Sequence, residues 1–219
     1  MPYTPVPLRY RKGSAVILSI DSTDLAEGTG IVNLFGAGAG SSKFLTRNSG
    51  VISQSDDNEN VLSTTSTATT DDDFDLAVFK IPQTLSGTMQ VTIPGHMRSS
   101  TSPMGGTNIV TITVRKVVSG GGETDIASAA SASFAWTNTS ANDFFHLIAK
   151  VTIPKTQFKK GDILRMNVAY AITRTSGSGT LLGGYAYDPS NNNTPTFIIG
   201  TDGCLSTVLT FFVPFDIDL

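Results

Sequence analysis

The chain has 219 residues, of which 39% are hydrophobic and 15% are charged, and its formal net charge is −3. This length fits one large all-β domain or two small ones, and the apolar content excludes wholesale disorder. The charge favours neither nucleic acid nor an anionic membrane as a partner. No apolar run reaches the roughly 18 residues of a membrane span, and the stretch 15–20 is too short for a signal-peptide core. A single cysteine, Cys204, excludes an internal disulfide and suits a reducing cytoplasm.

Residues 1–13 are predicted to form an extended N-terminal arm. Three prolines among the first seven residues hold the backbone extended and remove amide donors. Basic residues follow without a nearby acid. The arm is either a loose terminus or a segment that docks on a neighbouring subunit or a capsid. In the second case its contacts are Tyr3, Arg9, Tyr10, Arg11 and Lys12.

Residues 14–73 are predicted to form an N-terminal β segment, with strands at 15–20 and 31–35. The glycine-rich stretch 36–43 predicts a flexible turn. It is not a phosphate loop, because Lys43 follows the last glycine two residues too late.

The end of this segment is strongly acidic. Seven Asp and Glu residues lie between 56 and 75, and no Lys or Arg occurs between Arg47 and Lys80. Their spacing does not match a calcium-binding loop, so a solvated acidic loop is predicted, with an ion site as the alternative. The low-complexity stretch 64–70 is predicted to be a linker or loop.

Residues 74–219 carry the regular β pattern. In the stretch 108–118, Val110, Ile112 and Val114 alternate with polar residues, which is the period of a strand with one buried face. Seven or eight such segments are separated by turn signals. The pattern predicts an all-β fold, an antiparallel β-sandwich of jelly-roll type that carries the N-terminal arm.

The chain closes on an apolar strand at 205–219, which must be paired and buried. Pro214 cannot donate to a β-ladder, so this residue is predicted at an edge or a bulge. The aromatic residues Phe211, Phe212 and Phe215 are predicted, together with the arm, to contact another subunit or a capsid.

The phrase from Phe158 to Met166 (FKKGDILRM) is a turn followed by a strand. It resembles the F-x-x-G-D-x-L-x-V phrase of many jelly-roll sandwiches, including trimeric tumour-necrosis-factor-like heads and phage structural proteins. The chain as a whole is rich in Thr, Ser and Gly and poor in cysteine, and in this it resembles virion structural proteins of tailed marine bacteriophages. The resemblance implies a capsid decoration (cement) protein.

Catalytic motifs are not evident in the sequence. One cysteine and two distant histidines, His96 and His146, do not make a metal site, and no known nucleophile motif surrounds Cys204. We therefore expect no enzyme activity, no cofactor and no metal.

The expected function is capsid decoration. Such a protein binds the major capsid protein on the virion surface as a homotrimer assembled in the host cytoplasm, without direct contact to nucleic acid or membrane. One alternative is a tail or head-fibre module that binds host glycans, with Trp136, Tyr185 and Tyr187 stacking on sugar rings. Another is a single-jelly-roll capsid protein.

Overall fold

The computed structural model describes residues 29–39, 42–48, 59–100, 103–138, 142–187 and 209–216. Every regular element in these ranges is a strand, so the predicted all-β class is confirmed. No helix of the described residues is long and apolar enough to cross a membrane. The strands are β1 (Thr29–Ala39), β2 (Ser42–Thr46), β3 (Glu59–Thr64), β4 (Thr67–Asp75), β5 (Gln83–Ser99), β6 (Met104–Val117), β7 (Glu123–Ala130), β8 (Phe134–Asn138), β9 (Asn142–Phe158), β10 (Ile163–Ser176), β11 (Leu181–Ala186) and β12 (Thr210–Asp216).

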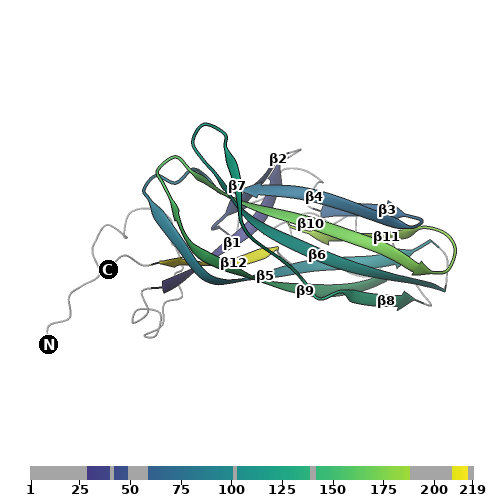
Figure 1. Ribbon diagram of the computed structural model, residues 1–219. Coiled ribbons are helices and arrows are strands. Elements are labelled where there is room, and N and C mark those ends of the chain that lie inside the picture. The colour runs from purple at the N-terminus through teal and green to yellow at the C-terminus, as the bar shows by residue number, and fades with distance from the viewer. Residues whose placement is uncertain are drawn as a thin grey trace, which may run out of the picture.

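Four antiparallel pairs nest inside one another along the chain. β1 pairs with β12, β4 with β10, β5 with β9, and β6 with β7. Pairing of first with last and second with next-to-last is the connectivity of a jelly roll, in which a long folded ribbon wraps around a core. The strands form one continuous hydrogen-bonded sheet that folds into two layers: β1–β12–β5–β9, called the first sheet, and β4–β10–β6–β7, called the second sheet (Figure 1).

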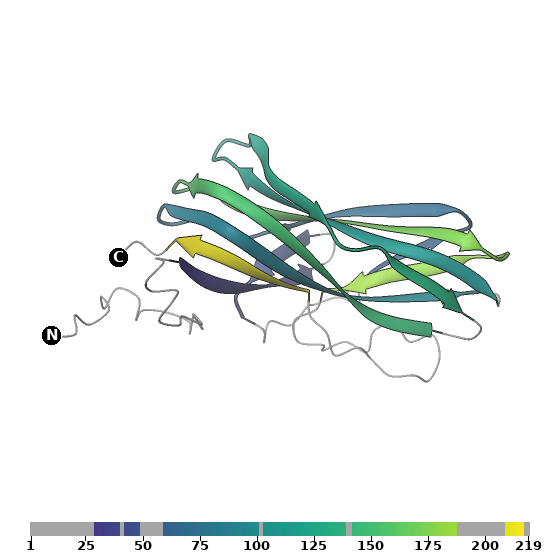
Figure 2. The ribbon, with the colours of Figure 1, turned by 60° about the horizontal axis from the view of Figure 1, so that its bottom comes forward.

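The remaining strands extend this frame. β11 pairs with the second half of β5 and carries β3, and β8 pairs with the first half of β6. β2 leaves β1 and reaches β4 through a single parallel bridge between Phe44 and Asp75, which joins the two sheets. The sheets lie face to face over the length of the molecule (Figure 2).

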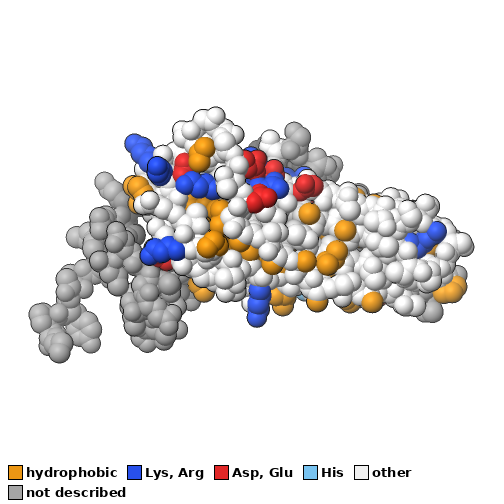
Figure 3. All heavy atoms as spheres, in the orientation of Figure 1, with side chains coloured by type: hydrophobic (Ala, Val, Ile, Leu, Met, Phe, Trp, Pro, Cys, Tyr) orange, Lys and Arg blue, Asp and Glu red, His pale blue; other side chains and the backbone are white. Residues whose placement is uncertain are grey.

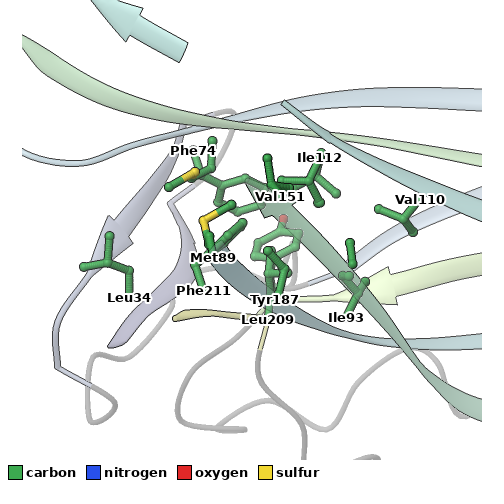
Figure 4. Close-up of a cluster of buried hydrophobic side chains, with 14 of the residues drawn as sticks. Leu34, Phe74, Met89, Ile93, Val110, Ile112, Val151, Tyr187, Leu209 and Phe211 are labelled. Atoms are coloured by element: carbon green, nitrogen blue, oxygen red, sulfur yellow. The ribbon is translucent and has the colours of Figure 1, made fainter. Parts of the chain in front are cut away.

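The core lies between the two sheets and follows the period of two. Ile112 and Val114 of β6 are fully buried, as are Val91 of β5 and Val151 of β9. Side chains from both sheets point into this shared interior (Figure 4). The strand predicted at 108–118 is therefore confirmed as an inner strand of the second sheet.

β5 runs on through Pro94 and Gly95, a pair of residues that is typical of a turn. Both residues are buried inside the strand, which ends only at Ser99. Gly95 permits this because a Cβ there would come within 2.5 Å of the Phe145 ring. The missing side chain makes room for the neighbouring strand, so the glycine does not mark a turn.

Three predictions for the N-terminal part are corrected. The glycine-rich stretch is strand up to Ala39, because Gly36 lets Leu209 and Phe74 pack against the bare backbone. The stretch 64–70 ends β3 and begins β4. The sandwich begins before residue 74, because β4 crosses that boundary and β1 pairs with β12.

Pro214 lies where the register between β12 and β5 shifts, which confirms the predicted bulge. The arm of residues 1–13, with Tyr3, Arg9, Tyr10, Arg11 and Lys12, lies outside the described residues, and so do the predicted strand at 15–20 and Cys204.

Candidate functional site

One end of the sandwich is built from three connections: residues 76–82, 118–122 and 159–162, here called the loop end. The carboxylate of Asp162 holds two of them together. It accepts hydrogen bonds from the backbone N–H of Lys159 (2.7 Å) and of Ser119 (3.4 Å), and it pairs with Lys116 Nζ at 3.1 Å. The bond from the Lys159 amide is the main reason that the pKa of Asp162 is lowered.

The third connection is attached through its backbone. The Phe79 N–H donates to the Asp162 carbonyl (2.9 Å), and the Gly161 N–H donates to the Phe79 carbonyl (2.8 Å). The Phe79 ring packs on Phe158 with centroids 5.1 Å apart. Gly161 has a φ of 93°, which favours glycine. These contacts explain why the phrase that begins at Phe158 needs an aromatic residue, a Gly and an Asp at those spacings.

The tips of the loop end expose aliphatic side chains. Val78 is 51% exposed, Ile81 63% and Val118 40%. Three exposed lysines lie in the same connections: Lys80, Lys159 and Lys160. Hydrophobic and basic side chains gather at this end of the molecule (Figure 3). Exposed apolar side chains rimmed by charge are typical of an interaction site.

The outer face of the second sheet carries a ladder of charges across four neighbouring strands. Arg165 of β10 binds Asp75 of β4 through two bonds of 2.6 and 2.8 Å, and Arg115 of β6 binds Asp125 of β7 at 2.7 Å. The hydrogen bonding that Arg165 donates to Asp75 is the main reason that the pKa of Arg165 is raised. Asn167 Nδ2 adds a bond of 2.8 Å to Asp73.

This surface, called the acidic face, holds five carboxylates against two guanidinium groups, a net of −3 (2 − 5). Its charged members are Asp71, Asp73, Asp75, Glu123, Asp125, Arg115 and Arg165. The predicted acidic loop is thus wrong for residues 71–75, which are strand, because cations and an amide of β10 and β6 partner their side chains. No group of His, Cys, Asp and Glu in the described part of the chain could hold a metal ion.

The predicted aromatic contacts of β12 divide between two faces. Phe211 and Phe215 are buried in the core of their own chain, so they do not serve as contacts to a partner. Phe212 points the other way and lines a shallow hollow with Ile31, Thr88 and Gln90. Ile148, 52% exposed, lies on β9 next along the same outer surface. These five residues are called the β12 face.

The residues considered for glycan stacking are core residues. Trp136, Tyr185 and Tyr187 are at most 3% exposed. The Tyr185 hydroxyl donates to Asp72, which also pairs with Lys43 Nζ at 2.9 Å. Burial raises the pKa of Tyr185 well above its usual value. The stacking role is therefore corrected: these rings pack the interior and satisfy a buried carboxylate.

The two histidines lie in different environments. His96 is buried in β5, and desolvation, reinforced by Arg98, lowers its pKa to about 3. His146 is exposed on β9. The buried imidazole is neutral near pH 7, as expected of a core residue in an apolar setting.

The fold and these surfaces define the class of the molecule: a jelly-roll β-sandwich with two contrasting exposed faces and one aliphatic, basic end. No protein-family model matches the chain, and no curated protein matches its sequence.

Solved structures resemble it only in fold. A CocE/NonD family hydrolase from Staphylococcus aureus is 13% identical, with a TM-score of 0.47 over 85% of this chain and 37% of the hydrolase. An α-amino acid ester hydrolase is 8% identical, with a TM-score of 0.48 over 86% of this chain and 36% of the other. The Eiger TNF of S. frugiperda is 11% identical, with a TM-score of 0.22 over 47% of this chain and 60% of that one.

These likenesses bear on two predictions: that the chain is not an enzyme, and that it resembles jelly-roll virion proteins. The prediction that the chain is not an enzyme is corrected, because hydrolases stand among the solved structures of similar fold. The chain spans little more than a third of their length, so the activity of those whole enzymes is not transferred to it. The further likenesses, to a TNF, a carbohydrate-binding module and infectious bursal disease virus, have TM-scores of 0.22 or less and carry nothing beyond the β-sandwich.

Proposed function

We propose that this protein is a virion structural component, a decoration protein that binds the major capsid protein on the head of a tailed phage. The observation that supports this most is the β12 face. Phe212 and Ile31 line an open hollow there, with the exposed Ile148 on the same sheet. The apolar members of the β12 face, Phe212, Ile31 and Ile148, have a charged neighbour, Lys150, which lies opposite Gln90 on β9. An apolar centre with charge at its edge suits a lasting protein–protein contact, since charged residues are depleted in interface cores and found at the rim.

The mechanism follows from where this face lies. β12 is held between β1 and β5, so a partner that covers Phe212 pulls on a central strand, not on a loose edge. Force that separates neighbouring capsid subunits then has to break the contact with this rigid sheet as well. β1 begins at Thr29, two residues before Ile31 of the β12 face.

Binding to particles tests the proposal. Phage heads that lack the protein are mixed with the purified chain and sedimented, and the bound fraction is measured by titration. Phe212→Asp is expected to weaken binding at least about tenfold, because a carboxylate replaces a buried aromatic contact. Ala135→Asp is the matched control, since Ala135 is exposed on β8 of the other sheet.

Two outcomes would count against the proposal in different ways. Wild-type chain that binds no heads refutes the decoration function itself. Heads that bind Phe212→Asp as tightly as wild type would leave decoration standing and remove the β12 face from it. A cryo-EM map of the particle distinguishes decoration from the single-jelly-roll capsid alternative, since a capsid subunit would form the continuous shell.

A further inference from the structure

The loop end exposes aliphatic and basic side chains together. Val78, Ile81 and Val118 project from three different connections that Asp162 and the Phe79 backbone hold as one unit. Among the described residues, no ion pair involves Lys80, Lys159 or Lys160. Asp162 is the acid within these connections, and it is buried and paired with Lys116. The exposed charge of the loop end is therefore +3.

The acidic face offers the opposite charge on a flat support. Its net charge is −3, and its carboxylates are held in place by bonds to Arg115, Arg165 and Asn167, so little side-chain freedom is lost when a cation arrives. Asp125 is 64% exposed along its side chain. Small side chains continue this face beyond the charges, with Ala169 and Ala130 both opposite Thr111. The protruding side chains of Val78, Ile81 and Val118 can pack on this flat surface of small side chains.

The two surfaces adjoin in one copy, since Asp75 precedes Leu76 and Glu123 follows Gly122. They face different directions, because the loop end lies beyond the ends of the strands, whereas the acidic face is the broad side of the second sheet. We infer that the loop end of one copy docks on the acidic face of a second copy. Such a contact joins different surfaces of the two partners, so it forms a closed ring where the rotation permits and an open chain where it does not.

This contact concerns copies of the chain and does not rest on the proposed decoration function. A closed ring of three would agree with the trimer expected from the resemblance to jelly-roll virion proteins. The β12 face belongs to the first sheet and stays free in this arrangement, so self-association and capsid binding use separate surfaces.

A charge exchange tests the inference on the full-length chain by analytical ultracentrifugation. Wild type is expected to self-associate, and raising the salt from about 0.15 M to about 1 M to weaken it, as the Debye length falls from about 8 Å to about 3 Å. The variant Lys159→Glu with Lys160→Glu is expected to weaken association at least about tenfold, and so is Asp71→Lys with Asp125→Lys. A chain that carries all four substitutions is expected to associate again, because the charges are complementary once more.

The controls separate charge from folding. Lys150→Glu changes an exposed lysine on β9, away from both surfaces, and is expected to leave association unchanged. Circular dichroism melting checks that each variant is folded. If the Asp71→Lys, Asp125→Lys chain does not fold, Ala130→Trp blocks the same face without touching a charge. Ile81→Ser is expected to weaken association even at high salt, because it removes apolar contact.

Three results would overturn the inference. One is a wild-type chain that stays monomeric at its highest soluble concentration. Another is an oligomer that Lys159→Glu with Lys160→Glu leaves intact. The third is a chain with all four substitutions that folds but does not associate again. A monomeric wild type that sediments with phosphatidylserine vesicles, and loses this when the two lysines are reversed, would assign the loop end to an anionic lipid surface instead.

Discussion

Two buried tyrosines differ in what their hydroxyl groups contact. The Tyr185 hydroxyl donates to Asp72, which pairs with Lys43 on its other oxygen. The Tyr170 hydroxyl faces Asn108, but no hydrogen bond of good geometry reaches its oxygen. The rings lie 5.7 Å apart and both side chains are fully buried. A Tyr→Phe substitution at position 170 is therefore a matched control for the same substitution at position 185.

Removing each hydroxyl is expected to change stability by different amounts. Tyr185→Phe leaves a buried carboxylate short of a donor, so the free energy of unfolding falls by about 1–3 kcal/mol. Tyr170→Phe removes a hydroxyl that makes no bond, so stability changes by less than about 0.5 kcal/mol or rises. Urea unfolding at neutral pH measures both. Equal losses for the two variants would contradict the assignment of Tyr185 as the partner of Asp72.

His96 makes the fold sensitive to mild acid. Its pKa is about 3 in the folded chain, below the usual 6.5, so only the unfolded chain takes up this proton between those values. The stabilising effect is complete above about pH 6.5 and declines as the pH falls toward 3. Between pH 6.5 and 5, unfolding free energy is expected to drop by about 1–2 kcal/mol.

Urea titrations at several pH values check this. The informative quantity is the slope of unfolding free energy against pH. His96→Leu is expected to flatten the pH dependence between 6.5 and 5, whatever its effect on absolute stability. His146→Leu, at an exposed position, is expected to keep the wild-type slope. A His96→Leu chain with an unchanged slope would mean that another group titrates.

At the scale of elements, β5 depends on a bare backbone at Gly95. An added Cβ would lie 2.5 Å from the Phe145 ring and 3.1 Å from the Gly184 carbonyl oxygen, so both neighbouring strands would have to move. Gly95→Ala is expected to lower the free energy of unfolding by about 1–3 kcal/mol through overpacking. Thermal melting tests this. Adding Phe145→Leu should recover part of the lost unfolding free energy. If the double variant lost more unfolding free energy than the two single variants added together, steric crowding would be excluded.

β4 shows how neighbours override local composition. A run of Thr and Asp is typical of a loop, yet Thr67–Asp75 pairs with β10 over its whole length. Asp72 and Phe74 point inward while Asp73 and Asp75 point outward to arginines. The alternation is visible in the sequence at Phe74, but the arginines that neutralise the strand come from residues 42 and 90 positions later.

At the scale of the whole molecule, β12 closes the jelly roll. It is the last strand of the described residues and lies between β1 and β5 in the first sheet. Deleting residues 209–219 is expected to prevent folding, because it leaves Leu34 of β1 and Val91 of β5 without their shared core neighbour. Deleting residues 1–13 is expected to leave a folded chain that binds phage heads more weakly.

Far-UV circular dichroism and heteronuclear NMR distinguish these outcomes. A folded chain without β12 would show that the first sheet can be assembled without its inner strand, contrary to the pairing seen here. If the chain without residues 1–13 bound heads as tightly as the full chain, the arm would be excluded as a capsid contact.

The sequence by itself determined the all-β class, the sandwich, the inner residues of β6, and the turn of Gly161 and Asp162 with the strand that follows it. These are local features: alternation selects a strand face, and a Gly–Asp turn carries its own hydrogen bonds. Only the tertiary structure decided that the glycine-rich stretch and the acidic run are strands, that Phe211 and Phe215 face inward, and that lysines and aliphatic tips share one end. Each depends on partners far away in the chain, because strand pairing is non-local and a neighbouring sheet sets which side chains need space or opposite charge.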